Sequence, residues 1–149
     1  MNPYLVKIEA TDRTTQSIRS AVINLNLSNF DIRQDFHCTL LFATEWHSEP
    51  KLIDHEPIIV RGTEIKLFGK AVVLILDDQQ NKLKNRHSEI KTEINARTQF
   101  DDFVPHLTLG FAKEGFKLTD DLKMYILNPF VNMDIILEKE KGKVFEQKK

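Results

Sequence analysis

Two segments of this chain, 69 residues apart, carry the same pattern of a histidine, any residue, a threonine and an apolar residue: HCTL at 37–40 and HLTL at 106–109. Each segment lies in a run of residues that favours a β-strand. Because side chains alternate between the two faces of a strand, each histidine shares a face with its threonine, and the apolar residues share the other. We therefore expect two strands, each with one polar face and one face that packs in the core.

Hydrophobic periodicity predicts the remaining elements. The run AVVLIL at 71–76 is apolar without alternation, which is typical of a strand covered on both faces. The predicted strands are 4–9, 36–43, 58–68, 71–76, 104–112 and 130–138, and the predicted helices are 14–25, 79–97 and a short one that begins at Thr119. The charged tail from Lys139 onward is predicted to fray.

This order of elements predicts an α+β fold with mostly antiparallel sheet. The length of 149 residues is consistent with one domain over residues 1–149. Each motif strand follows a predicted helix, which suggests two related lobes. No longer repeat accompanies the motifs.

Charge and composition narrow the classes of ligand and location. With 21 basic and 22 acidic residues, the chain lacks the positive charge that proteins use to hold long nucleic acids. A small phosphorylated ligand fits better. A single cysteine excludes an internal disulfide framework. The first residues lack the uninterrupted apolar core typical of a signal peptide, and no apolar run approaches membrane-spanning length. We expect a cytoplasmic protein that does not bind membranes.

The two motifs supply the groups that metal-independent phosphoryl transfer requires. If the two strands meet, His37 and His106 flank one phosphodiester, and the hydroxyls of Thr39 and Thr108 bind its non-bridging oxygens. One neutral imidazole accepts a proton from the attacking hydroxyl, and the other, as imidazolium, donates one to the leaving oxygen. A bell-shaped dependence of rate on pH around neutrality is the expected signature.

The paired motifs resemble those of the two-histidine (2H) phosphoesterase superfamily. Within it, the spacing and the chain length are similar to the phage anti-CBASS cyclic-oligonucleotide phosphodiesterases. The resemblance implies a bilobal α+β fold with a central cleft. It also implies cleavage of 3′–5′ phosphodiester bonds by the neighbouring 2′-hydroxyl, without a metal or other cofactor. The substrates it implies are cyclic di- and trinucleotides of CBASS antiviral signalling, which a phage-encoded member meets in the host cytoplasm.

Family members hold the bases on aromatic side chains and through a polar contact from a late strand. The candidate aromatic platforms in this chain are Tyr4, Trp46 and Phe68. Asp134 is the candidate for reading a base edge, because a carboxylate can accept from a purine amino group. Of these, Tyr4 and Asp134 are our predicted substrate-binding residues.

The other histidines and the cysteine have simpler interpretations. His87 lies on the apolar side of a predicted helix, and His47 and His55 lie in a polar loop without the partners that a zinc site needs. We therefore expect no metal site. Cys38 points away from His37 in a regular strand, so we expect it in the core.

Several alternatives stay open at this level. The same four residues also suit the opening of a 2′,3′-cyclic phosphate or the cleavage of 2′–5′ oligoadenylate. A module that sequesters a nucleotide without cleaving it is a third possibility. The near-symmetry of the motifs does not say which histidine is the base, and the sequence does not fix the preferred nucleotide or the oligomeric state.

Overall fold

A computed structural model describes residues 1–98 and 102–145. Across these residues eight strands form one sheet, accompanied by three α-helices and a short 3-10 helix. The strands are β1 (Tyr4–Ala10), β2 (Phe30–Ile32), β3 (His37–Glu45), β4 (Asp54–Phe68), β5 (Ala71–Asp77), β6 (Arg97–Thr98), β7 (His106–Ala112) and β8 (Ile135–Val144); the helices are α1 (Asp12–Leu25), α2 (Lys82–Glu93), α3 (Asp120–Leu127) and η1 (Asn128–Phe130). Every strand pairing is antiparallel, and the predicted α+β class is confirmed.

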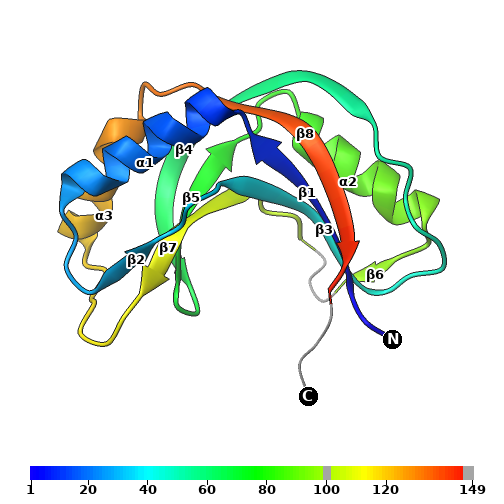
Figure 1. The fold of residues 1–149 in the computed structure, drawn as a ribbon, viewed down its shortest axis with the longest axis horizontal. Helices are drawn as coiled ribbons and strands as arrows, with labels where there is room; N and C mark the ends of the chain where they lie inside the picture. Colours follow the sequence, from blue (N-terminus) through cyan, green and yellow to red (C-terminus); the bar gives the residue numbers. More distant parts are fainter. Residues whose placement is uncertain (99–101, 146–149) are drawn as a thin grey trace.

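The sheet closes on itself. Its strand order is β2-β7-β5-β4-β8-β1-β3-β6, and an additional pairing joins β7 to β3. The strands β7, β5, β4, β8, β1 and β3 therefore form a ring. In this ring the pair β3–β7 lies opposite the pair β4–β8, with β5 between them on one side and β1 on the other. The ribbon forms an arch with β4 and β8 at its top, α1 and α3 at one end and α2 at the other (Figure 1).

Helix boundaries follow from side-chain caps. Thr11 and Thr119 each accept a hydrogen bond from a backbone N–H in the first turn, at 3.2 Å, at the start of α1 and α3. At α2 the carboxylate of Asp78 accepts from two backbone N–H groups, those of Leu83 and Lys84, at 3.2 and 3.0 Å. Helix α2 is shorter at both ends than the predicted 79–97. Residues 99–101, which follow β6, lie outside the described part.

The core lies on one face of the strands and beneath the helices. From the strands it takes alternate residues such as Val6, Ile8 and Leu74, each fully buried, and the helices add Ile18 and Leu83. Each such aliphatic side chain contributes roughly 1.5–3 kcal/mol of stability when removed from water. The opposite face of β3 and β7 is therefore the one left for chemistry.

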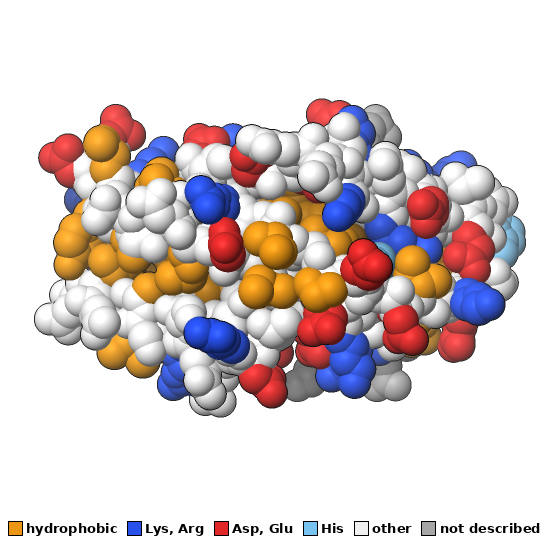
Figure 2. Space-filling model, turned by 90° about the horizontal axis from the view of Figure 1, so that it is seen from above, with side chains coloured by type: hydrophobic (Ala, Val, Ile, Leu, Met, Phe, Trp, Pro, Cys, Tyr) orange, Lys and Arg blue, Asp and Glu red, His pale blue; other side chains and the backbone are white. Residues whose placement is uncertain are grey.

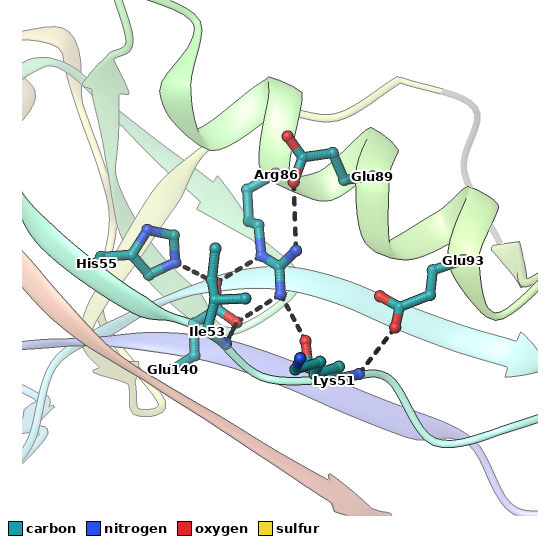
Figure 3. Close-up of polar contacts among 7 residues, drawn as sticks. All are labelled: Lys51, Ile53, His55, Arg86, Glu89, Glu93 and Glu140. Carbon is teal, nitrogen blue, oxygen red and sulfur yellow. Dashed lines mark hydrogen bonds and ion pairs between the residues drawn. The ribbon is translucent and has the colours of Figure 1, made fainter.

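The end of the chain differs from the prediction. Residues 130–134 form the end of η1 and a turn rather than a strand, and β8 continues to Val144 through the tail that was expected to fray; residues 146–149 of that tail lie outside the described part. The reason is long-range pairing, because β8 lies between β1 and β4. The alternating lysines face outward, whereas Glu140 is buried at 6% exposure and bound by Arg86 and His55 (Figure 3).

No helix among the described residues is long and apolar enough to cross a membrane.

Candidate functional site

The two motif strands are direct neighbours. β3 and β7 pair with Cys38 opposite Leu107, and both of these side chains are fully buried. Continuing this antiparallel register by one residue each way places His37 beside Thr108 and Thr39 beside His106. All four side chains share the face opposite the core, which we call the motif face. His37 and His106 therefore occupy diagonal positions across the strand pair. Diagonal positions in an antiparallel pair are about 7–8 Å apart, which leaves room for a phosphate between the two rings.

His37 is held in its neutral form. Burial, together with the nearby charges of Lys7 and Arg33, lowers the pKa of its imidazole to about 4, against smaller opposing effects of Asp35 and Glu9. Nδ1 is buried and has no hydrogen-bond partner among the described residues. Nε2 is therefore the nitrogen of this ring that can meet a ligand, and at neutral pH the ring is a proton acceptor.

The His106 ring is oriented by two contacts. Its Nδ1–H donates to the carbonyl oxygen of Val104 at 2.8 Å, and the ring meets Phe68 edge-on at 5.1 Å between centroids. This hydrogen bond assigns the proton of the neutral ring to Nδ1. Nε2 is again the nitrogen that can face a ligand.

The flanks of the motif face differ in character. On β1, Lys7 lies opposite Thr39 and Glu9 opposite His37. On β5, Val73 lies opposite Thr108, and Ile75 lies opposite His106. The β1 flank is charged and the β5 flank is apolar, so the pseudo-symmetry of the motifs does not extend to their surroundings.

Three residues near the motifs were not predicted from the sequence, namely Lys7, Arg33 and Phe111. Lys7 reaches the motif face through pairing with β3. Arg33 lies within Coulombic range of His37 and places its guanidinium 5.8 Å from the ring centroid of Phe111, which is 41% exposed. The polar-apolar alternation of strand 4–9 puts Lys7 on the outer face, but nothing local indicates which strand it adjoins.

Tyr4 lies in the core. Its side chain is 5% exposed, lies on the core face of β1 with Val6 and Ile8, and packs against Trp46 at 5.1 Å between ring centroids. Trp46 in turn donates from Nε1 to the carbonyl of Asn2 at 2.9 Å. Strand parity puts Tyr4 opposite to the motif side chains, so the structure does not bring it to the motif face.

Asp134 lies away from the motifs. It precedes β8 and accepts a hydrogen bond from Arg61 Nε at 3.2 Å, with more than half of each side chain exposed. Since Arg61 belongs to β4, the pair lies at the β4–β8 side of the closed sheet, across from β3–β7. A cavity of about 520 Å³ adjoins this pair, lined also by Asp77, Asp78 and Lys82. The structure does not bring Asp134 to the motif residues.

The outer side of the arch, seen from above in Figure 2, carries charged side chains of both signs around a central group of hydrophobic ones. Ile59 of β4 is 59% exposed and lines the cavity beside Asp134. No motif residue lines the cavity there, and we place the candidate site on the motif face because the reactive groups are there.

The remaining residues with reactive side chains are structural. Burial raises the pKa of the Cys38 thiol to about 12, and its predicted place in the core is confirmed. His87 binds the carbonyl of Leu40 through Nδ1 and stacks on Phe103 at 4.5 Å. His55 lies in β4 rather than in a loop and donates to Glu140. Within residues 1–98 and 102–145, no group of three His, Cys, Asp or Glu side chains is arranged to hold a metal ion.

Comparison with known proteins identifies the family. No curated protein sequence matches the chain significantly. Among solved structures, Usb1 of Kluyveromyces marxianus has a TM-score of 0.58 and 12% sequence identity, over 96% of this chain and 94% of that one. This likeness shows that the chain shares the fold of that protein over nearly its whole length. The model of the family described as anti-CBASS protein Acb1 matches residues 2–147. The chain therefore belongs to the Acb1 family of anti-CBASS proteins.

Proposed function

We propose that this protein is a phosphodiesterase that cleaves 3′–5′ bonds of cyclic oligonucleotides without a metal, and thereby counteracts CBASS signalling. The observation that carries the proposal is the placement of two histidines and two threonines on one face of a directly paired strand pair. Membership in a family named for its action against CBASS supports the choice of substrate class. The 2H-like fold supports the choice of reaction.

In this proposal the roles of the two histidines are distinct. Neutral His37 accepts the proton of the ribose 2′-hydroxyl through Nε2, and the 2′-oxygen attacks phosphorus. The P–O5′ bond breaks, and His106, acting as an imidazolium with protons on both Nδ1 and Nε2, donates the Nε2 proton to the departing oxygen. The products are a 2′,3′-cyclic phosphate and a free 5′-hydroxyl. The hydroxyls of Thr39 and Thr108 stabilise the charge that develops on the phosphate oxygens.

A direct assay tests the proposal. Purified protein is incubated with 3′,3′-linked cyclic dinucleotides and with cyclic trinucleotides in excess chelator, and the products are separated by chromatography. We expect linear products that end in a 2′,3′-cyclic phosphate. Intact cyclic substrates, together with cleavage of 2′–5′ oligoadenylate or of a 2′,3′-cyclic phosphate, would instead assign the site to a different nucleotide.

The depressed pKa of His37 predicts an unusual pH profile. Because the base is lost only when the pH falls through about 4, rather than through its ordinary value of 6.5, kcat/KM is expected to lack a base-protonation limb between pH 7 and pH 5. Replacing Lys7→Met removes one of the cations that oppose protonation, so this limb is expected to move to higher pH. The measurement is kcat/KM from pH 4 to 8.

The control for this profile is Lys123→Met, which removes an exposed lysine of α3 that pairs with Asp120. It is expected to leave the limb in place. A limb near pH 6.5 that is the same in the wild type and in the Lys7 variant would contradict the assignment of His37 as the base.

Aromatic side chains on the β5 side are the expected base platforms. Phe68 and Phe111 are each 41% exposed and lie opposite Ala71 from its two neighbouring strands. Stacking of a base on an aromatic ring contributes about 1–3 kcal/mol, so Phe68→Leu is expected to raise KM by roughly 5-fold or more. Steady-state kinetics on a cyclic dinucleotide measure it. Leu67→Ala, one position along and on the opposite face, serves as the control, and an equal effect there would argue against stacking.

A further inference from the structure

The charged flank of the motif face continues beyond β1 onto β8. Lys7 lies opposite Lys141, and Glu9 lies opposite Lys139, in the β1–β8 register. The carboxylate of Glu9 pairs with two ammonium groups. Its Oε1 lies 2.9 Å from Lys141 Nζ, and its Oε2 lies 3.6 Å from Lys7 Nζ. Lys139 lies opposite Asp54 of β4, so Lys7, Lys141 and Glu9 leave this flank with one positive charge more than negative ones.

The opposite flank does not match this charge. Beyond the apolar Val73 and Ile75 of β5, the next strand places Lys66 and Glu64 on the same face. These two side chains pair with each other at 3.9 Å, so their charges cancel. An anionic ligand centred on the β3–β7 pair is therefore attracted toward β1 and β8.

The lysines also lie at a suitable separation from the motifs. Lys7 adjoins Thr39 on the neighbouring strand, and its side chain is only 18% exposed, so water weakens its field less than at a free surface. Lys141 lies two strands from β3, which corresponds to about 10 Å between backbones. At this distance Lys141 is too far away to contact a phosphate held between the histidines. It is suitably placed to bind a second anionic group of the same ligand.

We propose that Lys7 and Lys141 form a second phosphate subsite, which holds the non-reacting phosphate of a cyclic oligonucleotide while the first lies between His37 and His106. This rests on the proposed function of the motif face. It also narrows the substrate class, because a ligand with two or more phosphodiesters fills both subsites. A nucleoside 2′,3′-cyclic monophosphate fills one.

Calorimetric binding to the His106→Ala protein, in which the ligand stays intact, tests the subsite. The two probes are 3′,3′-linked cyclic di-adenosine monophosphate and adenosine 2′,3′-cyclic monophosphate. Lys141→Met is expected to raise the Kd of the two-phosphate ligand about tenfold, the loss of one charge-assisted contact, and that of the one-phosphate ligand less than about twofold. Lys141→Arg, which keeps the charge, is expected to retain binding, and Lys123→Met is the surface control.

The outcomes separate the two proposals. Equal weakening of both ligands, no weakening of either, or no detectable binding of the two-phosphate ligand overturns the subsite. Binding of the two-phosphate ligand that depends on Lys141, in a wild-type protein that cleaves no cyclic nucleotide, upholds the subsite and refutes the proposed reaction. Cleavage with no dependence of binding on Lys141 does the reverse.

Discussion

Replacement of either motif histidine by alanine is expected to lower kcat/KM for a cyclic dinucleotide by a factor on the order of 10²–10⁴. His37→Ala removes the proposed proton acceptor, and His106→Ala removes the group proposed to protonate the leaving oxygen. Each ring lies on the motif face and is only partly buried, so neither substitution opens a cavity in the core. The loss is expected in kcat, since each proton transfer belongs to the transition state.

The matched control is His47→Ala, which removes an exposed imidazole from the loop after β3. Its rate should equal that of the wild type, and thermal melting should confirm that all three variants fold. A motif variant that keeps its rate would refute the assignment of that histidine. Tight binding of an uncleaved cyclic nucleotide by the wild type, unchanged in His106→Ala, would instead indicate a sequestering module.

Strand parity accounts for what the sequence could reveal about the site. A side-chain period of two puts His37 with Thr39 and His106 with Thr108, and it also excludes Cys38 from chemistry, whatever the rest of the fold. These relations involve neighbours along one strand. They needed only the assumption that the two strands meet, which the β3–β7 pairing provides.

The surroundings of the motifs depend on pairing between strands far apart in the chain. Lys7 and Lys141 are 134 residues apart, yet they lie side by side because β1 and β8 pair in one particular register. No local pattern specifies that register. The place of Tyr4 was not predictable for a related reason, because an aromatic residue near the start of a strand can face either side until the burial of Val6 and Ile8 fixes the parity.

The asymmetry of the flanks supports the different roles that we propose for two motifs that look alike. His37 lies on the side of the cations, which together with burial keep its ring neutral. His106 lies beside Ile75 and against Phe68, in apolar surroundings. The proposed division into base and acid therefore rests on the strands that flank each motif, and the motif sequences alone do not contain it.

The charged tail illustrates the same limit, since Glu140 belongs to a run that suggests a solvated end but is buried in a network of hydrogen bonds (Figure 3). Arg86 donates to its two carboxylate oxygens at 2.7 and 2.9 Å, and the N–H of Ile53 donates at 3.2 Å. Burial alone would raise the pKa of Glu140, but the hydrogen bonds from Arg86, His55 and Ile53 hold it below its ordinary value. The carboxylate is therefore charged, and its charge is compensated mainly by one arginine of α2.

Arg86→Leu is accordingly expected to lower the free energy of unfolding by about 3–5 kcal/mol, because it leaves a buried carboxylate without its main counter-charge. Glu140 has a fully buried side chain, and α2 is joined through Arg86 to β8 and to the carbonyl of Lys51 at 2.9 Å. Urea unfolding at pH 7 measures the change. The variant is expected to recover part of its stability as the pH falls and Glu140 takes up a proton.

Two further variants separate the buried charge from the surface contacts of the same arginine. Glu89→Ala removes a partner that is 63% exposed and lies 3.3 Å from Arg86, and it is expected to cost at most about 1 kcal/mol. The double variant Arg86→Leu with Glu140→Leu replaces the ion pair by apolar side chains and is expected to be more stable than Arg86→Leu alone. If the double variant is instead the less stable of the two, the cost lies in lost packing around α2 rather than in an uncompensated charge.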